Sequence, residues 1–325
     1  MTMEPYNISA YQPGDGLKIS SLFTKYSPYL RDDKFWVWIN RFFTQRSIVA
    51  VAEYGGHIIG HYAILPQKMQ IDGVSYNTGL GIHAFIAPEH TNNISIFQIS
   101  AYAYQMAKEQ GMDFIYGFPN KNYRLIQEKI ERWKKVALFN ALELPNEQLP
   151  GNYDYDYSVE QIDFSDFSDF YCLNDILEKS SHKRVEIAQN VSYWNNRYIL
   201  HPQHPYIYLK VLADGNVGGY FIGKYFTNNN IRYFHIVDFA IYDLVAMREA
   251  LLAVFHHQRS HFDKVSCWKG DDRTNLAYEE LGFHETGFDT FLGVKFLNKE
   301  VEEKISDIVL DFDNWRLVMG NSDAF

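Results

Sequence analysis

The sequence predicts an α/β fold of the α+β type, built from two similar halves that each hold a mixed, mostly antiparallel sheet flanked by helices. Two apolar runs around Gly55–Gly56 are typical of a β-hairpin, because this pair readily adopts the positive φ angles of a tight turn. The run Leu80–Pro88 is typical of a further strand, and it leads through a polar turn into a helical pattern. A similar order returns after residue 190, which indicates an internal structural repeat.

In the first half, apolar residues at helical spacing alternate with short apolar runs, and glycine-containing turns separate them. The aromatic stripe of the second helix is typical of core packing. The expected elements are helices over 16–26 and 33–44, the hairpin of 49–64, a strand over about 67–72 that turns at Asp72–Gly73, the strand 80–88, a helix over 94–109 and a strand over 113–117.

The second half is expected to begin at residue 151, because Pro145, Pro150 and Gly151 interrupt the regular pattern. The acidic run that follows, 152–170, is expected to be a solvated face. The expected elements are an aromatic helix over 193–198, a hairpin of 206–211 and 218–224, a strand over 234–242, a helix over 244–259, a strand over 264–268 and a helix over 271–282 with a C-cap glycine.

Composition and charge exclude several classes of function. The chain has 325 residues and is 46% hydrophobic and 22% charged, so it can bury an ordinary core. Residues 1–150 carry 14 Lys and Arg against 13 Asp and Glu, whereas residues 151–325 carry 16 against 27. This acidity disfavours a nucleic-acid partner, which needs clustered cations. Cys172 and Cys267 do not predict a disulfide framework or a zinc site.

No signal peptide, metal-binding motif or membrane-spanning run is visible in the sequence. We therefore expect a cytoplasmic protein without membrane insertion. A nucleophile–His–acid array and a phosphate-binding loop of the P-loop type are also absent from the sequence.

The succession of hairpin, strand, polar turn, helix, strand and Asn-rich loop resembles the acyl-CoA-binding core of the GNAT N-acyltransferase superfamily. In the second half, Tyr278 stands four residues before Gly282–Phe283, which is similar to a motif typical of that superfamily. The resemblance spans nearly the whole chain as two tandem GNAT-like domains. It implies that domain 1–150 binds acyl-CoA as co-substrate, that domain 151–325 binds the acceptor, and that no metal takes part.

The resemblance implies that acyl-CoA contacts three segments of the first half. The end of the strand would pair with the pantetheine chain, the start of the next helix would hold the pyrophosphate through its backbone N–H groups, and asparagine side chains would bond the pantetheine amides. The turn lacks the glycines of the family pattern, and Thr91 stands where that pattern has Arg or Gln. The cofactor-binding candidates are Phe85, Ile86 and Ala87 on the strand, Thr91, Asn92, Asn93, Ile94 and Ser95 in the turn, and Asn120, Asn122 and Tyr123 in the loop.

Three residues are candidates for catalysis. His83 lies in the strand position where related enzymes often carry an acid facing the amine, and its neutral imidazole could accept the proton directly or through water. The alternative is a core histidine. Asp238 lies on the corresponding strand of the second half, where an acid must be paired or poised for function. Tyr278 matches the family's general acid beside the leaving thiolate, or it packs in the core.

The expected function is acyl-CoA-dependent N-acylation of a small amine, with a nucleotide-linked amino sugar for surface polysaccharide as the suggested acceptor. One alternative is an aminoacyl-tRNA-dependent transferase of cell-wall synthesis, which the acidity disfavours. Another is a non-catalytic GNAT scaffold, which the missing glycines favour. The tail at 315–323 either caps a site or frays.

Overall fold

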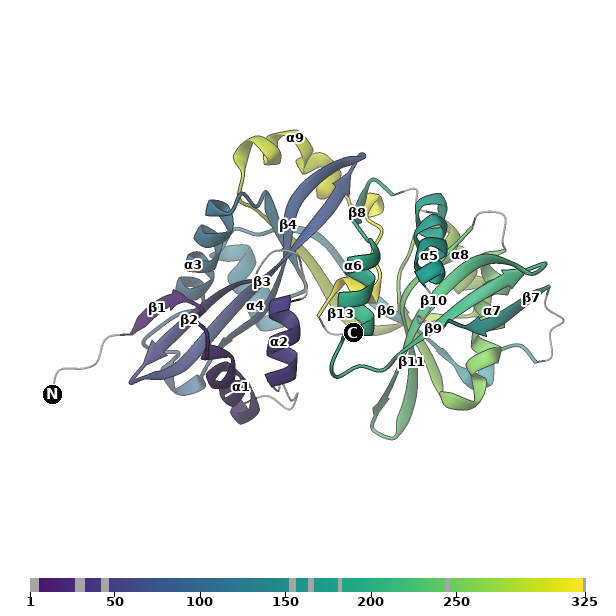
Figure 1. Ribbon diagram of the computed structural model, residues 1–325, viewed down its shortest axis with the longest axis horizontal. Coiled ribbons are helices and arrows are strands. Elements are labelled where there is room, and N and C mark those ends of the chain that lie inside the picture. The colour runs from purple at the N-terminus through teal and green to yellow at the C-terminus, as the bar shows by residue number, and fades with distance from the viewer. Residues whose placement is uncertain are drawn as a thin grey trace. The chain divides into compact units, whose positions relative to one another are not determined.

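The computed structural model describes residues 6–26, 33–41, 47–151, 156–162, 167–180, 183–242 and 246–323 (Figure 1). The chain divides into two compact units whose segments interleave along the sequence. Unit 1 comprises Met1–Leu138, Ser192–Gln203 and Phe291–Phe312, and unit 2 comprises Phe139–Val191, His204–Thr290 and Asp313–Phe325.

Unit 1 is a sheet with the strand order β1-β2-β3-β4-β5-β13, flanked by helices. Its elements are β1 (Asn7–Ala10), α1 (Asp15–Tyr26), α2 (Asp33–Arg41), β2 (Ile48–Tyr54), β3 (His57–Ile71), β4 (Val74–Ile86), α3 (Ile96–Glu109), β5 (Phe114–Gly117), α4 (Lys121–Lys129), α9 (Lys299–Val309) and the last residues of β13 (His284–Phe296). The hairpin around Gly55–Gly56 and the helix ending at Glu109 are confirmed. Residues 42–44 of the expected second helix lie outside the described ranges.

The separate strand expected over 67–72 is wrong, since these residues belong to the 15-residue strand β3. Pro66, which stands between the two expected strands, lies within β3 opposite Gly79, where the strand continues without interruption. The turn that follows is as expected, because Asp72 and Gly73 both have positive φ angles, of 49° and 75°.

A β-bulge lies in β4 at His83. His61 pairs with Phe85 and Ala63 with Ile82, so His83 and Ala84 together stand opposite Tyr62. His83 has a φ of 53°, in the left-handed region that residues other than glycine seldom occupy. Such a bulge re-aims the backbone of one strand and often lies beside a functional site.

The parallel strands β4 and β5 part just before this bulge. Their pairing runs from Thr78–Phe114 to Gly81–Gly117, and β4 then continues to Ile86 while β5 ends. Along Ile82–Ile86, β4 pairs in the described residues with β3 alone. A gap therefore opens at the C-terminal ends of the two strands, where open α/β sheets commonly bind ligands.

The two faces of this sheet carry different helices (Figure 1). The ring of His61 contacts Phe23 of α1 and Trp36 of α2. The next residue, Tyr62, contacts Tyr104 of α3 and Tyr123, which belongs to α4. Since successive strand residues point to opposite faces, α1 and α2 cover one face at this point and α3 and α4 the other.

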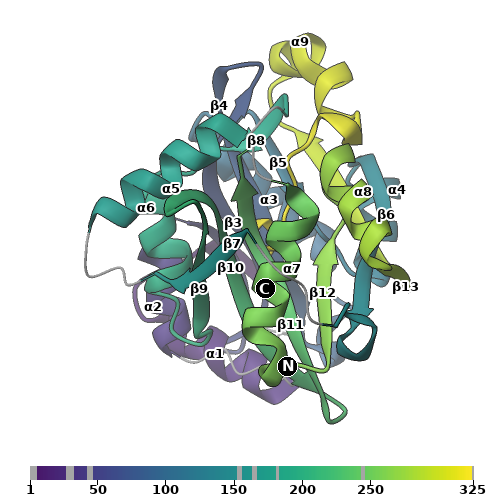
Figure 2. The same ribbon diagram turned by 90° about the vertical axis from the view of Figure 1, so that its right-hand side faces the viewer.

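Unit 2 is a second sheet with the order β6-β12-β11-β10-β9-β7. Its elements are β6 (Lys134–Pro145, whose first residues belong to unit 1), β7 (Tyr157–Gln161), α5 (Phe167–Ser180), β8 (Val185–Ile187), β9 (Tyr206–Ala213), β10 (Asn216–Asn228), β11 (Ile231–Ile241), α7 (Met247–Gln258), β12 (Lys264–Trp268) and α8 (Asp272–Leu281). Helix α7 and its neighbour α8 pack together beside these strands (Figure 2). Gly282 caps α8 with a φ of 87°, as predicted.

The predicted second hairpin, formed by β9 and β10, is confirmed, and so is the strand at 264–268. The aromatic helix expected over 193–198 consists of a short α-helix, Val191–Trp194 (α6), that continues as a π-helical turn over Asn195–Ile199. Residues 244 and 245, expected to begin the helix of 244–259, fall outside the described ranges, as do residues 152–155 and 163–166 of the acidic run.

Unit 2 repeats the strand geometry of unit 1. Strand β11 pairs in parallel with β12 from Tyr233–Lys264 to His235–Ser266 and then continues to Ile241. Its pairing with β10 shifts register between Ile222 and Gly223, which leaves Val237 as the extra residue beside Asp238. The predicted internal repeat therefore extends to a bulge near the end of the longer parallel strand.

Candidate functional site

The gap between β4 and β5 in unit 1 is the candidate acyl-CoA site. Phe85 and Ile86 form the end of β4, where both side chains are partly exposed, and Ala87 follows with a buried side chain. The N–H of Ala87 donates to the carbonyl of Ile59 at 2.7 Å, which fixes this end of the strand against β3. The β4 edge that faces away from β3 is the one that a pantetheine chain would pair with.

The turn after β4 leads into the N-terminus of α3 through a 3₁₀ turn at Pro88–His90. The side chains of Thr91, Asn92, Asn93 and Ser95 are exposed, whereas that of Ile94 is buried. The Thr91 hydroxyl donates to the carbonyl of Pro88 at 2.9 Å, and Gln98 Oε1 accepts from the Ser95 N–H at 2.9 Å. Backbone N–H groups at a helix start favour an anion. In this turn the N–H groups of Asn93 and Ile94 donate to the His90 carbonyl, as that of Ser95 does to Gln98.

The loop after β5 begins helix α4. Asn120 caps this helix, because its Oδ1 accepts hydrogen bonds from the N–H groups of Asn122 and Tyr123 at 3.1 and 3.0 Å. The Asn120 amide nitrogen is the part of this side chain that the cap does not use. The Asn122 side chain is exposed, and Tyr123 points to a buried carboxylate described below.

His83 lies among aromatic side chains on the α1–α2 face. Its ring centroid is 5.5 Å from that of Phe23, 5.6 Å from Phe35 and 6.0 Å from Trp36. The residue is partly exposed, whereas both of its ring nitrogens are buried. An aromatic environment of this kind accommodates both a neutral imidazole and the cation that it becomes after accepting a proton.

His61 is a second histidine at the bulge that the sequence analysis did not single out. Its Nδ1–H donates to the backbone carbonyl of His83 at 3.0 Å, so the lone pair lies on Nε2. The ring is fully buried, and burial lowers the pKa of His61 to about 4. His61 is therefore neutral at pH 7 and ties β3 to the strained residue. The sequence pointed to His61 only as a single histidine that follows Gly60 within an apolar run.

A buried carboxylate between α3 and α4 also went unnoticed in the sequence. Glu131 is 2% exposed. Its Oε1 accepts from the hydroxyls of Ser100 at 2.6 Å and Tyr123 at 2.9 Å, and its Oε2 accepts from Tyr104 at 2.5 Å. Ser100 and Tyr104 belong to α3 and Tyr123 to α4, so one carboxylate joins the two helices that follow β4 and β5. In the sequence, Glu131 appeared only as part of a charged segment.

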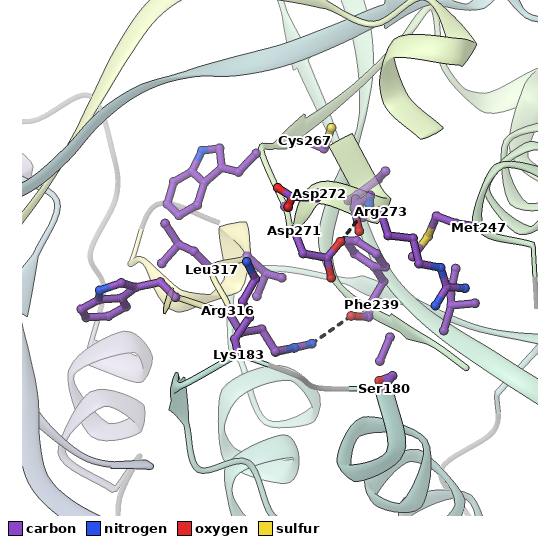
Figure 3. A pocket seen from close by; sticks show the side chains of 18 of the residues that line it. Ser180, Lys183, Phe239, Met247, Cys267, Asp271, Asp272, Arg273, Arg316 and Leu317 are labelled. Carbon is purple, nitrogen blue, oxygen red and sulfur yellow. Dashed lines mark hydrogen bonds between the residues drawn. The ribbon is translucent and has the colours of Figure 1, made fainter. Parts of the chain in front are cut away.

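In unit 2, Asp238 is held in an ion pair. Its side chain is fully buried, with Oδ1 2.9 Å from Nη2 of Arg316 and Oδ2 accepting from Gln189 Nε2 at 3.0 Å. Arg316 also donates to the carbonyl of Phe239 at 2.8 Å (Figure 3). The pair joins the bulge of β11 to the C-terminal segment of the chain.

Tyr278, on α8, is buried in the hydrophobic core of unit 2 beside the Cys267 thiol. It is 1% exposed, and burial raises its pKa. Both residues line a pocket of about 420 Å³ between β11, the start of α8 and the tail residues Trp315–Met319 (Figure 3). The charged residues that line this pocket include Asp271, Asp272 and Arg273 at the start of α8.

The C-terminal segment packs against unit 2. Trp315 pairs with Val185 in an isolated bridge, and the N–H of Arg316 donates to the Val185 carbonyl at 2.9 Å. The side chains from Leu317 to Ser322 are buried. The tail is therefore not frayed over Trp315–Ser322. It caps a site, as the other alternative predicted, because Trp315–Met319 line the pocket of unit 2.

The predicted site residues fall into two groups. His83 and the residues chosen for cofactor binding all belong to unit 1, whereas Asp238 and Tyr278 belong to unit 2. Within the described ranges, no group of three or more His, Cys, Asp and Glu side chains is arranged to hold a metal ion. No helix in that part of the chain is both long and apolar enough to cross a membrane.

Comparison with known proteins agrees with this geometry. Residues 23–128 match the family described as an acetyltransferase (GNAT) domain. A GCN5-related N-acetyltransferase from Anabaena variabilis is similar in structure, with a TM-score of 0.69, 14% identity and coverage of 91% of this chain and 74% of that one. The chain has the GNAT fold.

Two further structures are similar over both units. A tandem GNAT protein from the clavulanic acid biosynthesis pathway has a TM-score of 0.62 and 12% identity, with coverage of 90% of this chain and 99% of that one. The N-myristoyltransferase of Saccharomyces cerevisiae, with bound myristoyl-CoA, has a TM-score of 0.64 and 9% identity, with coverage of 90% and 82%. No curated protein sequence matches this chain significantly.

Proposed function

We propose that this protein is an acyl-CoA-dependent N-acyltransferase and that unit 1 binds the acyl-CoA. The observation that carries this proposal is the gap between β4 and β5, with a bulge at His83, inside the segment that matches an acetyltransferase domain. The corresponding region of unit 2 contains the chain's own Arg316, which already bonds the β11 carbonyl at Phe239. This difference favours unit 1 as the cofactor-binding unit.

In the proposed reaction, the acceptor amine attacks the thioester carbon directly. A C–N bond forms, the C–S bond breaks, and coenzyme A leaves as the thiolate. The proton of the attacking nitrogen passes to the His83 imidazole, directly or through water. The backbone N–H of Ile86, which alternation along β4 directs away from β3, polarises the thioester carbonyl, and the turn at Thr91–Ser95 with the start of α3 holds the pyrophosphate.

The other candidate residues take supporting roles in this proposal. The side chains of Asn120 and Asn122 bond the pantetheine arm. For Asn120 the bond is made by the amide nitrogen, since its Oδ1 already caps α4. Asp238 holds the tail through Arg316, and Tyr278 fills the core of unit 2. Unit 2 is proposed to contribute acceptor binding, with a small amine such as a nucleotide-linked amino sugar as the acceptor class.

The proposal is tested by thiol release from acetyl-CoA in the presence of a panel of amines that includes nucleotide-linked amino sugars. Replacing His83 with asparagine is expected to lower kcat about 100-fold or more at pH 7, since general base catalysis typically contributes this much. Asparagine tolerates the left-handed backbone conformation of residue 83, so the bulge should persist.

His57→Asn is the matched control, because His57 is an exposed histidine on β3 beside the Gly55–Gly56 turn. The control should retain full activity. Equal rates in the His83 and His57 variants would refute the role of His83. Failure of every amine to release thiol, combined with no acetyl-CoA binding, would favour the scaffold alternative, and a requirement for aminoacyl-tRNA would favour the other transferase class.

A further inference from the structure

The point at which β4 and β5 part is covered on the α3–α4 face by aromatic side chains. Gly81 and Gly117 are the last paired residues of the two strands. A Cβ atom added at Gly81 would lie 2.5 Å from the Tyr62 hydroxyl oxygen, and one at Gly117 would lie 3.4 Å from Cη2 of Trp133. The tyrosine and the tryptophan therefore lie directly on the backbone at this point, and we call these two side chains the aromatic floor.

The aromatic floor is buried and continues over the neighbouring strand. Tyr62 is 1% exposed and Trp133 is 4% exposed. A Cβ atom added at Gly293 of β13, which pairs with Gly117, would lie 3.3 Å from Cε3 of Trp133. A Cβ atom would thus clash with Tyr62 at Gly81, lie tightly against Trp133 at Gly293 and make ordinary van der Waals contact with Trp133 at Gly117, so the two aromatic side chains are packed directly against this backbone.

Hydrogen bonds hold the aromatic floor in one arrangement. The Trp133 indole N–H donates to the Tyr104 hydroxyl at 3.1 Å, and the hydroxyl oxygens of Tyr104 and Tyr62 are 3.5 Å apart. Tyr104 in turn donates to the Glu131 carboxylate at 2.5 Å. Because Tyr104 has a single hydroxyl proton and gives it to Glu131, its oxygen faces Trp133 and Tyr62 as an acceptor.

Resting on the proposed function, we propose that Tyr62 and Trp133, held by Glu131 through Tyr104, limit the acyl group of the donor to a short chain. The thioester lies at the bulge of β4, which begins two residues after Gly81. An acyl chain that extends between the diverging strands toward α3 and α4 meets the aromatic floor. Each methylene buried in an open pocket would raise affinity about fourfold. Here a long chain gains nothing from burial unless it displaces the packed Tyr62 and Trp133 side chains, and this displacement costs free energy, so longer chains are expected to bind more weakly.

The test is a calorimetric comparison of acetyl-, butanoyl- and octanoyl-CoA binding to the full-length protein, which requires no acceptor. The wild-type protein is expected to bind octanoyl-CoA at least tenfold more weakly than acetyl-CoA. In Trp133→Ala, the ratio of octanoyl- to acetyl-CoA affinity is expected to rise at least tenfold, because removal of the indole opens space below Gly117.

Phe114→Ala is the matched control, since Phe114 is a fully buried aromatic residue at the other end of β5. Its length preference should equal that of the wild-type protein. The inference is overturned if wild-type protein binds octanoyl-CoA as tightly as acetyl-CoA, a result that needs no variant to fold. It is also overturned if Trp133→Ala folds and keeps the wild-type preference. Absence of binding by any acyl-CoA would instead refute the proposed function, and this inference with it.

Discussion

Replacing Arg316 with alanine is expected to destabilise unit 2 by about 3–5 kcal/mol, because it leaves the fully buried Asp238 carboxylate without its ion-pair partner. The same change removes the hydrogen bond to the Phe239 carbonyl and loosens the tail against β11. The loss is measured as the change in the free energy of unfolding in urea. Hydrogen exchange of the β11 amides identifies which transition belongs to unit 2.

Two variants separate the ion pair from a general effect on the tail. Arg316→Leu combined with Asp238→Asn removes both charges and should recover part of the loss, since a neutral pair avoids an uncompensated buried charge. Lys183→Ala, which removes an exposed donor to the carbonyl of Asp313, should change stability by less than about 1 kcal/mol. If Arg316→Ala unfolds with the wild-type midpoint, the tail does not stabilise unit 2.

Replacing Glu131 with alanine is the second large expected effect, a loss of about 3–5 kcal/mol in the stability of unit 1. The change leaves the hydroxyls of Ser100, Tyr104 and Tyr123 without their acceptor, and each unsatisfied buried donor costs roughly 1–3 kcal/mol before the side chains rearrange. The measurement is urea unfolding monitored by exchange of the β4 amides.

Glu128→Ala provides the control for this substitution. Glu128 lies on α4, three residues before Glu131, and forms a partly exposed i,i+4 pair with Arg124, so its removal should cost less than about 0.5 kcal/mol. Glu131→Gln keeps the shape of the side chain, so its free energy of unfolding should lie between those of Glu131→Ala and Glu128→Ala. Equal stability of the Glu131→Ala and Glu128→Ala variants would show that the buried carboxylate does not join α3 to α4.

Much of the fold follows from short-range signals in the sequence. The Gly55–Gly56 and Asp72–Gly73 turns and the C-cap at Gly282 are positions where the backbone needs positive φ angles, and glycine marks them directly. The mixed sheet and the internal repeat were equally visible, because apolar periodicity repeats in both halves. The long strand β3 was not recognised as one element, since its 15 residues exceed the usual strand length and the apolar run was divided at Ile64.

The candidate site was less predictable, because it depends on contacts between residues far apart in the sequence. The bulge at His83 arises from its register with β3, and a histidine within an apolar run does not mark a positive φ angle as directly as a glycine does. Glu131 is buried only because α3 presents two hydroxyls to it, and nothing local distinguishes it from Glu128. Arg316 lies 78 positions from Asp238, so their ion pair has no signature in either segment.

The most direct test of the account is hydrogen exchange of the wild-type protein with and without acetyl-CoA, read peptide by peptide. The account predicts protection of residues 82–87 of unit 1 and of the turn and first helical residues at 91–98. It predicts no change at 236–241 or 271–275 of unit 2, where Arg316 of the tail already bonds the β11 carbonyl of Phe239. Protection confined to those two segments of unit 2 would contradict the assignment of acyl-CoA to unit 1.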